Sequence, residues 1–370
     1  MKKNIKVISL LLVMLLLSIS LMACGQTEKI DEGSKDTEKE ITEVVESKDD
    51  AEKETTEVAE SKDDTEKVEE TEAIPFTVAT LKGPTGMGMV KLMDEVDKGE
   101  NKMGASFSIT GVPDELVGKI INDEIDFACL PTNLAAVLYN KTGGKIQLAA
   151  VNTMGVLYMV EVGDEINSIS DLKGKKIFAN GQGSTPEFVL RYLLEKNDIN
   201  PDEDVELNFS LQHSELATAT AAGDVNLALL PQPHVTVATM QNKDARIALD
   251  LTKEWENIEG NDSELAMGCI VVKKEFAEKN PEVVEEFLNS YKQSVEWVNA
   301  NNKDAAELIA KYGILPKAPI AEKALPNCNI VYREAEEAKQ TLNGFYKILF
   351  DFNPKSLGGK LPDEGFYYNK

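Results

Sequence analysis

The chain has 370 residues, which is long enough for one large domain or two lobes, and its formal net charge is −25. The charge is uneven, because residues 25–73 contain 20 Asp and Glu against 7 Lys, a net charge of −13. The rest of the chain is also acidic overall. This argues against nucleic acid as a partner, since nucleic-acid-binding domains present basic patches.

Residues 1–23 have the composition of a signal peptide. A basic segment at 1–6 precedes an apolar run at 7–22, which leads into Leu21-Met22-Ala23-Cys24. This tetrapeptide resembles a bacterial lipoprotein box, in which cleavage leaves Cys24 lipidated at the new N-terminus. An uncleaved transmembrane anchor and a plain secretory signal are the alternatives, although the run is short for a membrane span. We expect the protein on the extracytoplasmic face of the cell membrane, held there by acyl chains.

Residues 24–73 form a low-complexity acidic segment that follows the predicted cleavage site. A 14-residue unit at 41–54 recurs at 55–68. Such a segment has too little apolar surface to offset the entropy lost on ordering. We expect a disordered, self-repelling tether between Cys24 and the folded domain, with a fraying charged helix as the alternative.

From about residue 74, apolar strand-like runs alternate with helical patterns. Strands are expected at residues 76–81, 105–110, 126–130, 147–152, 156–162, 176–179, 205–211, 227–230, 246–250 and 265–272. Helices are expected at 88–97, 113–122, 132–139, 185–197, 213–222, 233–241, 281–301, 304–312 and 333–350. This alternation predicts parallel sheets with helices on both faces.

A glycine turn at residues 180–187, Asn-Gly-Gln-Gly-Ser-Thr-Pro-Glu, lies between a predicted buried strand and a predicted helix. Its two glycines allow positive φ, Thr185 is placed as the N-cap, and Pro186 suits the first helical position. A capped helix start directs free amide groups at a ligand. A tight turn without any ligand is the alternative.

Three cysteines besides Cys24 lie in apolar or strand-like contexts, at Cys129, Cys269 and Cys328. Buried free thiols are expected, with one disulfide as the alternative. A metal site is not expected, because only His213 and His234 could add ligands and neither has a ligand spacing.

Motifs for catalysis are missing from the sequence. It contains no Gly-x-Ser-x-Gly elbow, His-Glu-x-x-His helix or Walker loop. Ser184 activated by a distant His213 or His234 is the remaining enzymatic alternative.

Three segments resemble the type II periplasmic solute-binding proteins. Residues 169–177, Ile-Ser-Asp-Leu-Lys-Gly-Lys-Lys-Ile, resemble the segment that opens the second lobe in that family. Residues 123–128 and 221–228 resemble its G-x-x-D-x-A runs, with Asn226 replacing an acidic residue. Over about residues 75–355, the chain is similar to the nitrate, sulfonate and thiamine-precursor binding proteins of ABC importers.

The resemblance implies an α/β fold with two lobes of mixed, mostly parallel sheet, flanked by helices and joined by two crossing strands. Lobe 1 would comprise residues 75–160 plus 266–370 and lobe 2 residues 161–265, with the crossings near 158–163 and 264–268. It also implies a monomeric substrate-binding protein of an ABC importer, not an enzyme, that has no cofactor and has a small-molecule solute and a membrane permease as partners. A tripartite-transporter receptor, a sensor module and an enzyme on this scaffold are the alternatives.

The same resemblance places the solute in a crevice at the carboxyl ends of the strands. The candidate ligand-binding residues there are Thr85, Met87, Thr132, Asn133, Asn152, Gln182, Ser184, Thr185, Gln232 and His234. These loops contain no Arg, and Lys82 lies only at their edge, so we expect a neutral or weakly polar organic solute. Helix caps, turns and core packing are the alternative roles of these residues.

Overall fold

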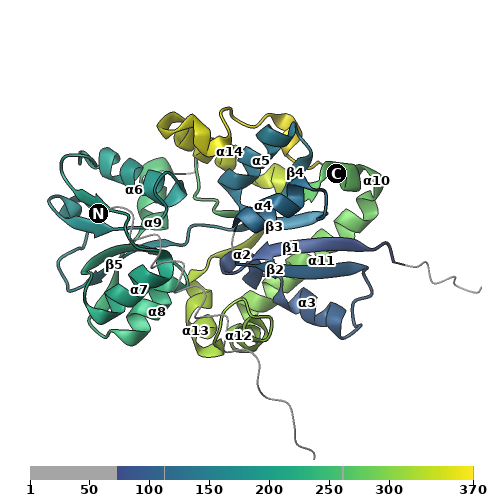
Figure 1. Cartoon of the computed structure of the whole chain (residues 1–370), viewed down its shortest axis with the longest axis horizontal. Helices are drawn as coiled ribbons and strands as arrows, with labels where there is room; N and C mark the ends of the chain where they lie inside the picture. Colours follow the sequence, from purple (N-terminus) through teal and green to yellow (C-terminus); the bar gives the residue numbers. More distant parts are fainter. Residues whose placement is uncertain (1–72, 112, 261, 370) are drawn as a thin grey trace, which may run out of the picture. The chain divides into compact units, whose positions relative to one another are not determined.

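The computed structural model describes residues 73–111, 113–260 and 262–369. The predicted signal peptide, the lipidation site Cys24 and nearly all of the predicted tether lie outside these residues. The described chain is an α/β structure with two mixed sheets flanked by helices (Figure 1). None of its described helices is long and apolar enough to cross a membrane.

The first sheet has six strands in the order β11-β4-β10-β3-β1-β2. Their bounds are β1 Phe76–Leu81, β2 Ala105–Thr110, β3 Phe127–Pro131, β4 Ile146–Thr153, β10 Gly268–Lys273 and β11 Ile330–Glu334. β1 pairs in parallel with β2 and β3, whereas β10 is antiparallel to β3 and β4, and β11 is antiparallel to β4. The antiparallel pairs join late strands of the chain to early ones, which local alternation does not reveal.

The second sheet has five strands in the order β7-β6-β8-β5-β9. Their bounds are β5 Leu157–Val162, β6 Lys176–Phe178, β7 Glu206–Asn208, β8 Leu227–Pro231 and β9 Ala245–Asp250. β6 is parallel to β7 and β8, and β5 is antiparallel to β8 and β9.

Helices cover both faces of each sheet. Their bounds are α2 Pro84–Met87, α3 Val90–Asp97, α4 Pro113–Ile121, α5 Thr132–Thr142, α6 Thr185–Lys196, α7 His213–Ala222, α8 His234–Gln241, α9 Leu251–Glu259, α10 Lys274–Lys279, α11 Pro281–Ala300, α12 Asn302–Lys311, α13 Ala318–Ala324 and α14 Ala335–Phe352. In Figure 1, α7 and α8 lie on one face of the five-stranded sheet, and α6 and α9 lie on the other.

Burial on both faces explains why the central strands read as continuous apolar runs. In β5, Leu157 and Met159 pack into one core cluster, while Tyr158 and Val160 pack into the cluster on the opposite face. β3 behaves in the same way, so that the sequence of a central strand shows no polar face.

The three described cysteines are buried and free, as expected from their apolar contexts. Cys129 and Cys269 lie on neighbouring strands, yet they belong to core clusters on opposite faces of the six-stranded sheet. This arrangement keeps the two thiols from pairing without a rearrangement of the sheet. Burial raises the pKa of the Cys129 thiol to about 12.

The neighbours of Trp255 in the sequence are mostly polar, yet this residue lies in a helix and in the core. Trp255 lies in α9, is fully buried, and its indole N–H donates to the Ser263 hydroxyl oxygen at 3.2 Å. The helix begins after Asp250, whose carboxylate accepts a hydrogen bond from the Thr252 backbone N–H at 3.0 Å. Asp at this position is typical of a helix N-cap, although the polar and charged composition of residues 252–259 does not indicate a buried helix.

The chain passes from the first sheet to the second at residues 154–156, between β4 and β5, and returns between β9 and β10. The expected crossing at 158–163 therefore overlaps β5 through residue 162, and the expected lobe boundary at residue 160 falls inside that strand. Only three residues separate β4 from β5, and both strands are apolar, so the sequence marks no break between them. The division into two lobes stays a prediction.

Candidate functional site

A cavity of about 570 Å³ opens at the carboxyl ends of strands from both sheets. Strands β1, β3, β4 and β8 end there at Leu81, Pro131, Thr153 and Pro231. The first residues of α4, α6, α7 and α8 also line it. This is the position in which open α/β sheets hold ligands, and the volume suits a small organic molecule.

Six of the ten candidate ligand-binding residues line this cavity. They are Thr85, Asn133, Ser184, Thr185, Gln232 and His234. They come from loops and first helical turns that are as far as 149 positions apart in the sequence, and the fold brings these segments to one place. Their contact with a solute stays a prediction.

The other four candidates lie elsewhere. The Met87 side chain is 0% exposed and packs in the core beneath the first sheet, and Gln182 is exposed at the tip of its turn, outside the cavity. The Thr132 hydroxyl donates to the Ala266 carbonyl at 2.5 Å, which ties α5 to the segment before β10. These placements depend on the direction in which each side chain leaves its helix and on how deeply its loop is buried. Residue types alone do not show either property.

Asn152 is fully buried beneath the cavity and holds its floor in place. Its side-chain N–H group donates to the Thr85 carbonyl at 3.3 Å and to the Tyr291 hydroxyl at 3.2 Å. Its side-chain oxygen accepts a hydrogen bond from the Thr153 hydroxyl at 3.1 Å. Asn152 therefore positions α2, which carries Thr85, and is itself no part of the cavity lining.

The glycine turn differs from expectation in its cap. Ser184 is the N-cap of α6, and Thr185 is its first residue. The Ser184 hydroxyl donates to the Gly181 carbonyl at 2.5 Å and caps no helix amide, so it tightens the turn instead. Gly181 and Gly183 have φ of 87° and 73°, as glycine turns require.

The Glu187 carboxylate takes the hydrogen bond of one backbone amide in this turn, so that amide is not available to a ligand. Its carboxylate accepts a hydrogen bond from the Gly183 backbone N–H at 2.6 Å and another from the Arg191 side chain at 2.8 Å. The carboxylate is buried, so the protein supplies its own anion at this point. The turn lines one side of the cavity, but it has fewer free backbone amides to bind a phosphate than its two glycines suggest.

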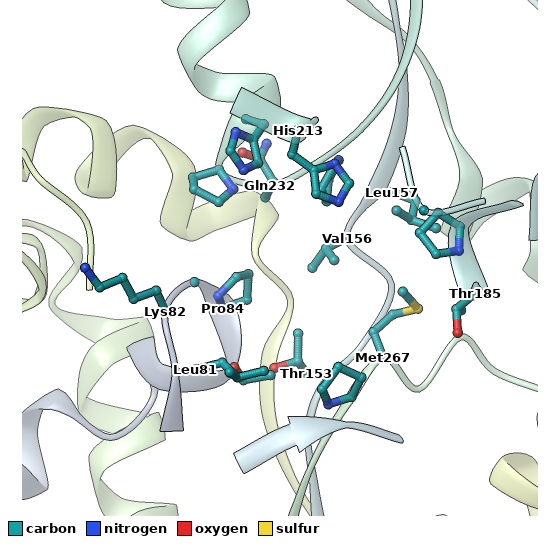
Figure 2. A pocket seen from close by; sticks show the side chains of 18 of the residues that line it. Leu81, Lys82, Pro84, Thr153, Val156, Leu157, Thr185, His213, Gln232 and Met267 are labelled. Carbon is teal, nitrogen blue, oxygen red and sulfur yellow. The ribbon is translucent and has the colours of Figure 1, made fainter. Parts of the chain in front are cut away.

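Sequence reasoning missed several residues of the lining. Ile314 and Leu315, from the connection between α12 and α13, and Met267, from the segment before β10, add apolar surface. His213 adds an imidazole from the start of α7. Figure 2 shows His213 and Gln232 on one side of the cavity and Thr153 on the other. No local pattern marks these residues, because only tertiary packing brings their segments to the cavity.

The lining carries little charge. Its ionisable residues are Lys82, His213 and His234, with no Asp, Glu or Arg among the described residues that form it. Burial lowers the pKa of His213 to about 4, with the nearby His234 as a second cause, and burial also lowers the pKa of His234. Both shifts favour the neutral form of the imidazole. Lys82 is exposed, and its ammonium group points away from the other labelled side chains in Figure 2.

Residues 98–314, more than half of the chain, match the family described as ABC transporter, phosphonate, periplasmic substrate-binding protein. The chain belongs to this family. Its members are substrate-binding proteins of transporters and not enzymes, in agreement with the absence of a catalytic motif.

Among curated proteins, the chain is similar to the binding protein YtlA of Bacillus subtilis (strain 168), with 24% identity over 139 residues. This match spans 37% of the chain and 39% of the length of that relative. Such partial coverage supports the family assignment without transferring the relative's own activity.

Solved structures extend the likeness over most of the described chain. An ABC transporter protein from Parabacteroides distasonis is 28% identical, with a TM-score of 0.68, and the match covers 80% of this chain and 99% of that one. The periplasmic aliphatic sulphonate binding protein SsuA from Escherichia coli is 18% identical, with a TM-score of 0.63 and coverages of 81% and 92%. These likenesses confirm the fold of type II periplasmic binding proteins.

Proposed function

We propose that this protein is a lipid-anchored, extracytoplasmic substrate-binding protein that captures a small organic solute and presents it to an ABC permease. The observation that carries the proposal is the cavity at the carboxyl ends of both sheets, in a chain of this transporter family. The nearly uncharged lining favours a neutral or weakly polar solute, because a fully ionised one would lack a buried counter-charge.

Capture is proposed to occur by hinge closure of two lobes, divided at residues 154–156 and at the return before β10. Both crossings are tied to one segment of the chain. The Asn329 carbonyl accepts a hydrogen bond from the Met154 backbone N–H at 3.0 Å, and Arg333 forms an ion pair with Glu264 at 2.5 Å. Such anchored crossings suit a hinge whose equilibrium is shifted by a ligand that contacts both lobes.

Binding is tested by calorimetry and thermal shift against a panel of thiamine precursors, sulfonates, aromatic carboxylates and nucleobases, with small-angle scattering to detect closure. A bound solute should raise the melting temperature and reduce the radius of gyration. A matched pair of variants locates the site. Asn133→Trp fills the cavity and should abolish binding, whereas Gln182→Trp, outside the cavity, should leave it intact. Equal effects of the two variants would remove the cavity from the proposal.

The lipid anchor is tested separately with Cys24→Ser. The natural chain should sediment with membranes and incorporate labelled fatty acid, and the variant should do neither. Retention of the variant in the membrane fraction would favour an uncleaved transmembrane anchor.

A further inference from the structure

The chain has two histidines in all, and both line the cavity. His213 is the first residue of α7 and His234 is the first residue of α8. The two side chains therefore come from separate helices that pack on the same face of the five-stranded sheet. Their rings stack with centroids 5.5 Å apart and an interplanar angle of 21°. Two flat rings held nearly parallel offer a planar surface to whatever enters the cavity.

One atom of this pair lacks a partner. His213 Nδ1 is buried and has no hydrogen bond within the described chain. A buried polar atom without a partner is destabilising, and the ring of His213 lies in the lining of the cavity. Nδ1 is closed to solvent in the arrangement described, so a solute would reach it only after the imidazole rotates about its Cβ–Cγ bond. A solute that supplies a hydrogen-bonding group beside a flat ring would then satisfy this atom and extend the stack.

The surroundings of the pair disfavour a fully ionised solute. Among the described residues, the lining holds no Arg, and Lys82 is exposed at its edge. Each histidine stands at the positive end of a helix, where an additional proton on the ring is unfavourable. The pair therefore offers neutral hydrogen-bonding nitrogens and ring faces in place of a counter-charge.

We propose that His213 and His234 are the recognition element of the solute site, and that the solute is an uncharged planar ring compound with an amide-like hydrogen-bonding group beside the ring. The inference rests on the proposed function, because it names the class of solute that the same cavity takes. It assigns His213 a role in specificity that its position in the sequence does not suggest.

The probes are benzamide, benzoate, benzenesulfonate, phenylphosphonate and cyclohexanecarboxamide. The first four share a ring and differ in charge, and the last keeps the amide without planarity. Affinities are measured by calorimetry on untagged full-length protein, and selectively labelled histidine reports the two imidazoles by NMR. Benzamide should bind at least tenfold more tightly than each other probe and should shift both histidine signals. Tighter binding of any anion, or binding that leaves both signals unmoved, would overturn the inference.

Variants separate the ring from its nitrogen. His213→Phe keeps a flat ring without Nδ1 and should weaken benzamide binding about tenfold, whereas His213→Asn restores a polar atom near Nδ1 and should weaken it less. Ser214→Ala, an exposed neighbour outside the cavity, is the matched control. Melting temperatures of all variants establish that each is folded. Equal affinities of the Phe variant and the natural protein would overturn the role of His213.

The outcomes also separate this inference from the proposed function. If a solute of the wider panel closes the lobes while no probe of the benzamide series binds, the solute class is wrong and the transport function stands. If nothing in either set binds or closes the lobes, both are overturned.

Discussion

Replacing Asn152 by alanine should destabilise the protein strongly, even though Asn152 contacts no bulk solvent and lies outside the cavity. The substitution removes three hydrogen bonds, to the Thr85 carbonyl, the Tyr291 hydroxyl and the Thr153 hydroxyl. The Tyr291 and Thr153 side chains are themselves buried, so their hydroxyls lose a partner that water cannot readily replace. At about 1 kcal/mol per net hydrogen bond, with a further penalty for stranded groups, the expected loss is about 2–4 kcal/mol.

The assay is equilibrium urea unfolding followed by circular dichroism and tryptophan fluorescence, whose transitions must coincide for a two-state analysis. Asn133→Ala is the matched control, because Asn133 is half-buried, lines the cavity and has no hydrogen-bond partner in the described chain. Its free energy of unfolding should change by less than about 0.5 kcal/mol. If the two variants unfold with free energies within about 0.5 kcal/mol of each other, the positioning role of Asn152 is refuted.

Three further predictions concern residues beside the cavity and the first crossing. The free energy of unfolding should fall by about 1–3 kcal/mol as the pH drops from 6.5 to about 4. The reason is that the unfolded chain takes up a proton on His213 that the folded chain binds only near pH 4. Urea unfolding of His213→Asn should show a flatter dependence on pH over this range. Ser184→Ala should lower the free energy of unfolding by about 1 kcal/mol, because it removes the hydrogen bond to the Gly181 carbonyl. Thr185→Ala removes no hydrogen bond and should lower the free energy of unfolding by less than about 0.5 kcal/mol. A larger loss for Thr185→Ala than for Ser184→Ala would contradict the structure. Gly155→Ala places a Cβ 2.0 Å from the Thr252 hydroxyl oxygen and should lower the free energy of unfolding by about 2–3 kcal/mol. In a double-mutant cycle, Thr252→Ala should recover part of this stability. Strictly additive effects of the two substitutions would refute the contact.

Much of the fold was predictable from local pattern. Apolar runs of four to eight residues marked most strands, and the loops after them marked the edge where the cavity lies. The motif at residues 169–177 indicated the family, and residues 98–314 match that family. The pairing directions and the crossing at 154–156 were not predictable, because they depend on which distant strands meet across the sheet.

The candidate site divides along the same line. Loop position selected Thr85, Asn133 and Gln232 correctly as lining residues, since side chains just beyond strand ends lie near the same edge. Met87 resembles them in the sequence but faces the core, since one turn of α2 rotates it away from the cavity. Ile314 and Leu315 come from a connection more than 200 residues after β1, and nothing in their local sequence indicates it.

The sequence by itself determined the α/β alternation, the family resemblance and the nearly uncharged loops, because these follow from local composition and spacing. The tertiary structure alone decided that His213 stacks on His234, that Glu187 fills an amide of the glycine turn, and that Asn152 supports the cavity from beneath. The physical reason is that burial, hydrogen-bond partners and ring geometry are set by segments far apart in the chain. Residue types identify which groups are available, and packing decides which of them face a solute.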